Sequence, residues 1–332
     1  MNIPLKHIRA LTLLSGGLDS QLAVYVLKDQ GIDVHGVVFD NPFSEIESAE
    51  RAAQKLGIPL HVRNYAGDII SLLGKSKHGF GSCMNPCIDC HALMLRRAGE
   101  LMEEMGFDFL STGEVLNERP MSQNRRSLEI VAKESGYADL ILRPLSAKLL
   151  SETKPEREGW VDRSRLLSIE GRSRKQQLSL ARHYGMTDIP TPAGGCKLTE
   201  PNFCRRLKDI QEHEGLDGGV RSIYLLRLGR HLRLNEKQKI IIGRDEHENM
   251  MLENLAELYD LIISTDDFPG PTGLITSPEI SEEEVRISGE ICAHYSDCPK
   301  DRNVMVTIIS SRGIRRMEVM PASSETIEKL RI

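Results

Sequence analysis

The chain lacks any apolar run long enough to cross a bilayer, although 40% of its 332 residues are hydrophobic. Its first residues lack the basic, apolar and small-residue segments of a secretory signal. None of the ten histidines forms an HxxxH pair that would indicate a metal site. Internal repeats and low-complexity tracts are absent as well. We therefore expect a soluble, cytoplasmic protein without a membrane partner, long enough for two ordinary domains.

Cysteine, by contrast, occurs seven times, an odd number that does not suit the disulfide framework of a secreted protein. Three of these residues, Cys83, Cys87 and Cys90, are crowded together. Crowded thiols in a reducing compartment are typical of metal or thiol chemistry. The cysteines without convergent spacing are expected to be small buried hydrophobes, and they are Cys204, Cys292 and Cys298.

Charge is unevenly distributed along the chain. The formal net charge of −5 argues against a nucleic-acid partner, but a sum says little about local surfaces. Between Arg221 and Lys239 there are six Arg or Lys residues and one Glu, which we call the basic stripe. The stripe favours a phosphate-binding surface in the second half, whereas a solvated face is the ordinary role of a charge run.

The most informative motif is Ser15-Gly16-Gly17-Leu18-Asp19-Ser20, which follows the apolar run 11–14. Two adjacent glycines let the backbone bring its N–H groups close to phosphate oxygens, and a following helix adds the positive end of its dipole. The spacing matches neither the GxxxxGK(S/T) loop nor the GxGxxG fingerprint. The motif predicts a phosphate-binding loop of another type. The alternative is a tight turn in which Asp19 and Ser20 only cap a helix.

Short apolar strands alternate with amphipathic helices from Ala10 to about Gly113, as in βαβ units around a parallel sheet. The pattern predicts strands at 11–14, 34–39, 60–64 and 107–112, and helices at 21–29, 45–56 and 90–105. A glycine-rich break at 215–219 precedes segments typical of strands, at 223–234 and 239–244, and a helix at 246–261. The expected fold class is α/β, a doubly wound parallel sheet in residues 1–214 with a smaller α+β domain in residues 220–332.

Doubly wound sheets bind ligands beyond the carboxyl ends of their strands. That rule places Phe39, Thr112 and Gly113 at the same rim as the glycine motif. We expect Phe39 to cover an adenine base and Thr112-Gly113 to face a nucleotide, while core packing and a simple turn explain them equally well. The cations of segment 171–175 are candidates for a phosphate or RNA contact, with a solvated helix start as the alternative.

The SGGLDS motif resembles the SGGxDS loop of the PP-loop ATP pyrophosphatases, which adenylate a substrate oxygen and release pyrophosphate. The resemblance implies that Ser15, Gly16, Gly17 and Ser20 bind ATP. It also implies that Asp19 helps to hold Mg²⁺ and takes part in catalysis.

A second resemblance concerns the cysteines. Cys87 and Cys90 form a CxxC element, and Cys196 follows a glycine-rich loop that the fold can return to the same rim. The pattern is similar to that of the tRNA thiolation branch of PP-loop enzymes, whose iron–sulfur members hold a [4Fe-4S] cluster. The resemblance implies Cys87, Cys90 and Cys196 as cluster ligands, with Cys196 also catalytic. A persulfide and its resolving thiol on Cys90 and Cys196, or a structural zinc site or buried thiols, remain open. Cys83 departs from the family pattern and its role stays open.

The second domain resembles the RNA-binding module of the NFACT family in segments 228–230 and 240–245. A dimerisation or packing domain is the alternative, and a homodimer stays among the expected partners. Together the resemblances imply a tRNA thiouridine synthase, in which ATP adenylates a uracil carbonyl and sulfur from sulfide or a separate donor replaces the oxygen. The product is 2-thiouridine or 4-thiouridine. The rival functions are an ATP-dependent amide or amidine synthetase and a non-catalytic RNA-binding iron–sulfur protein.

Overall fold

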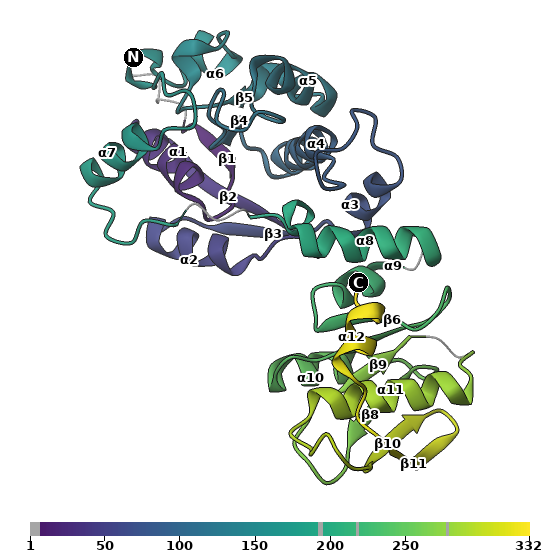
Figure 1. The fold of residues 1–332 in the computed structure, drawn as a ribbon. Coiled ribbons are helices and arrows are strands. Elements are labelled where there is room, and N and C mark those ends of the chain that lie inside the picture. Colours follow the sequence, from purple (N-terminus) through teal and green to yellow (C-terminus); the bar gives the residue numbers. More distant parts are fainter. Residues whose placement is uncertain (1–6, 192–194, 217–218, 277–278) are drawn as a thin grey trace. The chain divides into compact units, whose positions relative to one another are not determined.

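The computed structural model describes residues 7–191, 195–216, 219–276 and 279–332. The chain divides into two compact units, Met1–Thr199 and Glu200–Ile332 (Figure 1). Each unit has its own sheet and its own hydrophobic core.

The first unit alternates strands and helices. Its strands are β1 (Arg9–Leu13), β2 (Asp33–Asp40), β3 (Leu60–Asn64), β4 (Phe109–Thr112) and β5 (Ile141–Leu142). Its α-helices are α1 (Leu18–Lys28), α2 (Glu47–Leu56), α3 (Ala66–Leu73), α4 (Cys87–Met105), α5 (Arg125–Ser135), α6 (Lys154–Arg157) and α7 (Lys175–His183). Short 3₁₀ turns lie at 138–140, 147–149, 163–165 and 197–199.

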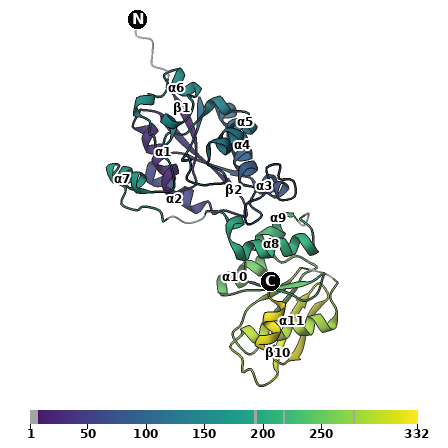
Figure 2. The same cartoon turned by 45° about the horizontal axis from the view of Figure 1, so that its top comes forward.

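The described strands of the first unit form a parallel sheet in the order β3-β2-β1-β4-β5. Helices cover both faces, with α1, α2 and α7 on one side and α4 and α5 on the other (Figures 1 and 2). The central strand β1 is buried on both faces, as the neighbouring residues Ala10 and Leu11 show. The predicted doubly wound sheet is confirmed. The order in which strands are added reverses between β1 and β4, and such a switch point is where doubly wound sheets bind ligands.

Two helices of the first unit begin earlier than their periodicity predicts. α1 begins at Leu18, directly after Gly17, and α4 begins at Cys87, directly after Pro86. The Cys90 N–H donates to the Pro86 carbonyl at 2.8 Å and so closes the first turn of α4. Both motifs therefore lie in the first turns of helices, where backbone N–H groups have no intrahelical partner.

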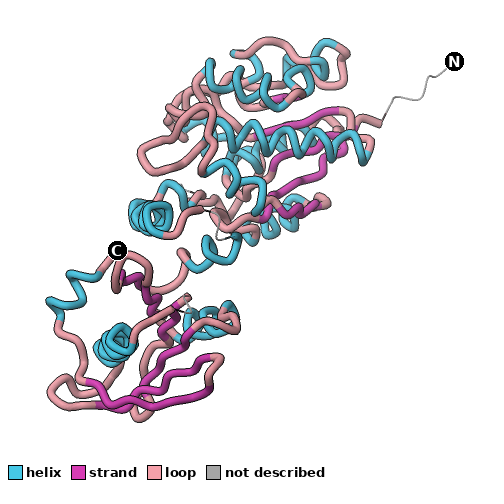
Figure 3. The backbone as a smooth tube through the Cα atoms, turned by 90° about the vertical axis from the view of Figure 1, so that its right-hand side faces the viewer, coloured by secondary structure: helices cyan, strands magenta, loops and turns pink. Residues whose placement is uncertain are grey.

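The second unit combines helices with an antiparallel sheet. Its helices are α8 (Pro201–His213), α9 (Gly219–Leu225), α10 (Glu246–Leu255), α11 (Glu282–Tyr295) and α12 (Ser324–Leu330). Its strands are β6 (Arg230–Arg233), β7 (Lys239–Ile242), β8 (Leu261–Thr265), β9 (Gly273–Ile275), β10 (Val304–Ser310) and β11 (Gly313–Val319). The described strands follow the order β11-β10-β8-β9-β7-β6, drawn in magenta in Figure 3.

Strand β7 explains why this sheet has helices on both faces. Ile240 and Ile242 join the core that includes residues of α11, whereas Ile241 points to the opposite core with Leu225 and Leu252. Because side chains alternate across a strand, a run of consecutive isoleucines requires cover on both sides. The separate α+β second domain is thus confirmed.

Some local predictions for the second unit were wrong. The first residues of the strand predicted at 223–234 belong instead to α9, in which Ile223 and Leu225 are buried. The helix expected to run to Leu261 ends at Leu255, because the Asp260 carboxylate accepts the Glu257 N–H at 2.7 Å and closes a turn before β8. In the described part of the chain no helix is long and apolar enough to span a membrane.

Helix α8 is tied to the second unit, whereas the sequence analysis grouped residues up to 214 with the first. Arg206 of α8 donates to the backbone carbonyls of Leu226 and Gly229, at 2.8 and 2.9 Å. Asp209 of α8 forms an ion pair with Arg233 of β6. These long-range contacts give α8 its place, and no local pattern in the sequence encodes them.

Candidate active site

The turn from β1 to α1 holds the SGGLDS motif. Gly16 has φ +80°, and a Cβ there would lie 2.4 Å from the carbonyl carbon and oxygen of Ser48, so a side chain does not fit. The Ser20 hydroxyl donates to the Gly17 carbonyl at 2.9 Å and fixes the turn. The turn leads directly into the N-terminus of α1, whose N–H groups and dipole favour an anion.

Gly113 brings the end of β4 against this turn. A Cβ on Gly113 would lie 2.4 Å from the backbone nitrogen of Ser20 and 2.6 Å from the carbonyl carbon of Asp19. Thr112, just before it, is buried, and its hydroxyl donates to the Glu114 carboxylate at 3.2 Å. The close approach means that Thr112-Gly113 and the SGGLDS turn form one surface.

The Asp19 carboxylate is only partly satisfied. Its Oδ1 atom is buried and has no hydrogen-bond partner among the described residues. Burial raises the pKa of Asp19, while Gln177, Arg174 and Arg119 act in the opposite direction. The nearby Gln177 amide favours the charged form of the Asp19 carboxylate. Both polar side-chain atoms of Gln177, Nε2 and Oε1, are nevertheless buried and have no hydrogen-bond partner among the described residues. An orphaned carboxylate oxygen is a site that a cation can fill.

Glu118 is a second carboxylate near Asp19, and no sequence motif indicates its role. Burial raises the pKa of Glu118 and the charge of Asp19 raises it further, while Arg119 and Arg174 lower it. Arg174 comes from the cationic segment 171–175 and stands at the N-cap of α7. Two carboxylates and two guanidinium groups thus act on one another beside the SGGLDS turn, as suits Mg²⁺ and phosphates.

Glu114 connects β4 to the cysteine-bearing helix. Its carboxylate is 2.9 Å from the His91 Nδ1 of α4 and accepts the Arg143 Nε–H at 2.8 Å. Burial by itself raises the pKa of Glu114, but the positive charge of Arg143 and the contact with His91 outweigh it and lower the pKa to about 2. The carboxylate is therefore ionised and clamps the first turn of α4 to the rim.

Cys87 and Cys90 lie one turn apart at the start of α4. The Asn85 amide donates to the Cys87 sulfur at 3.0 Å, and the Tyr65 hydroxyl donates to the Cys90 carbonyl at 3.2 Å. Burial raises the pKa of the Cys90 thiol, and the Cys196 and Cys87 sulfurs raise it further. Cys87 and Cys196, the two cysteines predicted to act with Cys90, therefore both lie within electrostatic range of its sulfur.

The segment that carries Cys196 returns to the sheet. The Lys197 N–H donates to the Phe43 carbonyl, after β2, at 2.8 Å. Residues 192–194, just before it, lie outside the described residues. In the described ranges no three His, Cys, Asp or Glu side chains are arranged to hold a metal ion. The three thiols suit iron or zinc by chemical type, and a bound cation would favour their deprotonated form.

Other predicted residues have ordinary surroundings. Phe39 is buried, and its ring centroid lies 5.2 Å from that of Tyr65, so its role at an adenine base stays a prediction. Cys83 is half-buried near Asn85. The cysteines predicted to be small buried hydrophobes are indeed buried, and they are Cys204, Cys292 and Cys298.

Two family models match parts of this chain. Residues 8–153 match the tRNA methyl transferase HUP domain, whose fold is that of the PP-loop superfamily. Over these residues the first unit has the fold of that superfamily. Residues 229–331 match the NFACT protein RNA binding domain, which lies within the second unit. Both resemblances predicted from the motifs are confirmed. We call the SGGLDS turn, which lies within the matched range, the PP-loop.

Curated relatives of the PP-loop domain have names that refer to tRNA. The tRNA-specific 2-thiouridylase MnmA 1 of Syntrophus aciditrophicus is 28% identical over 236 residues, 62% of either chain. The tRNA-specific 2-thiouridylase MnmA 2 of Clostridium botulinum is 34% identical over 122 residues, 32% of this chain and 34% of that protein. The chain thus spans less than two thirds of the length of these relatives.

A solved structure of a 4-thiouridine synthetase–RNA complex with bound ATP also shares part of its sequence with this chain. It is 26% identical, covering 41% of this chain and 36% of that one, with a TM-score of 0.33. A TM-score of this size does not support a structural argument, so the fold assignment rests on the sheet order and the family models.

Proposed function

We propose that this chain catalyses ATP-dependent thiolation of a uridine in tRNA. The observation that carries the proposal is the contact chain at the rim of the first sheet. Gly113 packs against the PP-loop, and the next residue, Glu114, binds His91 beside Cys90. Nucleotide loop and cysteines are thereby adjacent, as required when one substrate carbon is first activated by ATP and then attacked by sulfur.

The PP-loop domain binds ATP through Ser15, Gly16, Gly17 and Ser20 in this proposal. Its support is the glycine-restricted turn at the N-terminus of α1, which favours phosphate. Asp19 holds Mg²⁺, whose charge stabilises the phosphate oxygens, and the orphaned Oδ1 atom supports this role. Glu118 is the second carboxylate available to the metal. Arg174 is a candidate contact for the departing pyrophosphate.

The reaction has two steps. The uracil carbonyl oxygen of the tRNA attacks the α-phosphate of ATP, forming a C–O–P bond while the bond from the α-phosphorus to the pyrophosphate oxygen breaks. Backbone N–H groups and guanidinium groups aimed at the phosphates stabilise the charge that develops there. Hydrosulfide then attacks the activated carbon, AMP leaves with the original oxygen, and loss of the sulfur proton gives C=S. No net oxidation or reduction occurs.

The cysteines deliver sulfur in this proposal, with Cys87, Cys90 and Cys196 as the ligands of a [4Fe-4S] cluster. Such a cluster supplies an open iron that binds hydrosulfide. The influence of the Cys87 and Cys196 sulfurs on the Cys90 thiol, together with the placement of Cys87 and Cys90 in the first turn of α4, supports this ligand set. Cysteine sulfurs that bind a four-iron cluster lie further apart than sulfurs that bind a single metal ion. Three sulfurs that are too far apart for a single ion can therefore still bind a cluster. A persulfide on Cys90 or Cys196 is the rival, and it leaves a disulfide between the two after transfer.

The RNA is bound with the help of the second unit. The match of residues 229–331 to the NFACT protein RNA binding domain supports this assignment. The names of the relatives support tRNA as the nucleic acid. The base must leave its stack to reach a buried rim, which costs least in a loop.

Mass spectrometry of nucleosides tests the proposal. Unmodified tRNA is incubated anaerobically with the full chain, reconstituted with iron and sulfide, in the presence of ATP and Mg²⁺. We expect an ATP-dependent 2- or 4-thiouridine, lost in Cys196→Ser and retained in Cys204→Ala, a buried thiol of the second unit. Sulfur transfer by wild type without iron, from a persulfide donor, would select the persulfide route. Pyrophosphate release that requires ammonia and yields no thionucleoside would instead indicate an amide synthetase.

A further inference from the structure

A hollow of about 280 Å³ in the second unit is lined mainly by arginines. They come from separate parts of the unit: α8, β6, the turn after β7 and the residue that follows α12. We call this set the arginine pocket, and its members are Arg205, Arg206, Arg230, Arg244 and Arg331.

The pocket is built by specific backbone geometry. Gly229 has φ +62°, and a Cβ there would lie 2.4 Å from the Ile242 carbonyl oxygen, so glycine is required. Its carbonyl accepts a hydrogen bond from Arg206 at 2.9 Å, and Leu226 accepts a second at 2.8 Å. The Ile332 N–H donates to the His231 carbonyl at 3.1 Å, which holds the end of the chain against β6. The Arg206 guanidinium is thus held in place.

The arginine pocket holds more positive charge than its neighbouring carboxylates neutralise. Arg244 pairs with Glu248, and Arg331 pairs with Glu328 at 2.9 Å. Among the described residues, Arg205, Arg206 and Arg230 form no ion pair with a carboxylate. Their contacts are neutral: Arg205 donates to the Asn202 amide oxygen, and Arg230 lies 4.7 Å from the Tyr295 ring centroid. Burial lowers the pKa of Arg206, and the neighbouring charge of Arg244 lowers it further.

Arg230 also belongs to the basic stripe, but three other cations of the stripe are neutralised by carboxylates. Arg221 pairs with Asp260, Arg233 with Asp209, and Lys239 with Glu214 at 2.6 Å. Lys239 is even buried, so its charge serves the fold. The stripe therefore does not offer the continuous cationic surface that its sequence predicts.

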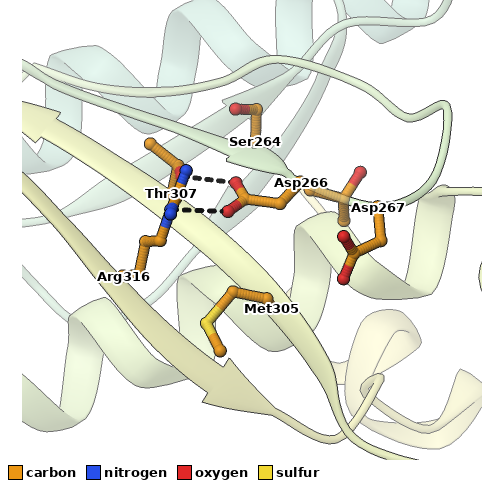
Figure 4. A pocket seen from close by; sticks show the side chains of 7 residues that line it. Ser264, Asp266, Asp267, Met305, Thr307 and Arg316 are labelled. Carbon is orange, nitrogen blue, oxygen red and sulfur yellow. Dashed lines mark hydrogen bonds and ion pairs between the residues drawn. The ribbon is translucent and has the colours of Figure 1, made fainter.

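A second hollow of the same unit, of about 640 Å³, gives the contrast. Its arginine, Arg316, lies 2.8 Å from the Asp266 carboxylate, which also accepts the Thr307 hydroxyl. Figure 4 shows Asp266 pointing at Arg316 and Asp267 beside it. That hollow is neutral or acidic, and an anion gains nothing from it.

We propose that the arginine pocket binds a phosphate group of the RNA backbone. The proposal rests on the proposed function for the nature of the RNA. Unpaired guanidinium groups from different elements match the several oxygens of a phosphodiester. Arg205 and Arg206 lie outside the matched residues 229–331, so α8 adds two phosphate contacts to the RNA-binding module. The contact positions the RNA without reading its sequence.

Salt-dependent binding of transcribed tRNA to the full chain tests this assignment. Arg205→Gln is the first variant, because this exposed side chain makes only a local contact and its loss leaves the fold intact. We expect an affinity lower by about three- to tenfold and a plot of log K against log salt that is flatter by about one unit. Arg206→Gln should show a similar change, and a thermal melt separates it from loss of fold. Arg316→Gln is the matched control, with the same change of charge in the neutral hollow.

The pocket and the proposed function can fail separately. If Arg205→Gln and Arg206→Gln bind tRNA as Arg316→Gln does, with an unchanged salt slope, the pocket does not contact RNA and the proposal is overturned. Weaker binding in the pocket variants supports the pocket even if no thionucleoside forms. Binding of ATP in the absence of RNA should be the same in all three variants. Thiolation that is normal at saturating tRNA but weak at low tRNA supports both assignments.

Discussion

Two carboxylates at the rim of the first sheet have opposite surroundings. Glu114 accepts a hydrogen bond from Thr112, and its partners Arg143 and His91 lower its pKa to about 2 despite its burial. Asp19 has a buried oxygen with no hydrogen-bond partner in the described ranges, and burial raises the pKa of its carboxyl group. We infer from this difference that Glu114 stabilises the fold through its ion pair, whereas Asp19 serves to bind a cation. Function should be lost at one residue and stability at the other.

The largest effect is expected for Asp19→Asn. ATP-dependent pyrophosphate release should fall by about 100-fold or more, because the site loses a charge aimed at the metal and phosphates. The melting temperature should not fall, since burial disfavours the charged form that the substitution removes. Rates and thermal melts of the same preparation check both halves. A variant that keeps wild-type turnover would remove Asp19 from the proposed site.

Glu114→Ala should behave in the reverse way. Arg143 then stays buried without its partner, which costs the first unit about 3–5 kcal/mol of stability. Chemical denaturation followed by a probe in the first unit measures the loss. Glu134→Gln, at an exposed ion pair with Lys77, is the control and should leave the transition in place. An unchanged transition in Glu114→Ala would mean that the carboxylate is not part of the scaffold.

Gly113→Ala tests the contact between the two regions. The added Cβ would meet the backbone of Ser20 at 2.4 Å, so either β4 or the PP-loop must shift. We expect a destabilisation of about 1–3 kcal/mol, typical of overpacking, together with a weaker affinity for ATP. Gly106→Ala, a glycine with open space around it, controls for the loss of a flexible residue, although its φ of +69° adds strain. Full ATP affinity in Gly113→Ala would separate β4 from the nucleotide site.

The pH dependence gives the smallest effect. The pKa of Glu114 is lowered from 4.5 in the unfolded chain to about 2 in the folded one, so the unfolded chain binds more protons between these values. The stability that ionised Glu114 contributes is complete above pH 4.5 and lost as the pH falls towards 2. The stability gap between wild type and Glu114→Gln should therefore narrow over that window. A gap that is constant from pH 6 to 3 would contradict the lowered pKa.

The sequence predicted the first unit well because its signals are local. Apolar runs gave the strands, and the glycine motif and CxxC element each mark a helix start. Phosphate-binding turns depend on a few adjacent residues, so SGGLDS could be read without the fold. Glu118 and Gln177 could not, because nothing in their neighbourhoods distinguishes them from ordinary surface residues. Gln177 gains a role from the packing of α7 against α1, and Glu118 from the turn after β4, which brings it near Asp19.

The second unit was less predictable for the same reason. A count of Arg and Lys residues predicted the basic stripe, but ion pairs with Asp209, Glu214 and Asp260 consume much of its charge. The unpaired arginines come from α8 and β6, which are separated by α9 in sequence. The charge of a surface depends on which acidic residues the fold places beside its cations. Those acidic residues can be far away in the sequence, so a local count of Arg and Lys does not predict the charge.

Helix α8 has a consequence for how this module can be exchanged between proteins. The family match begins at residue 229, yet Arg233 and the buried Lys239 depend on Asp209 and Glu214, which precede it. A fragment trimmed to the matched residues would leave two cations without counter-charges beside the sheet. The structural unit of this half of the protein therefore starts at about Glu200. Recombination at residue 229, where the family match begins, would separate Asp209 and Glu214 from the cations that they stabilise.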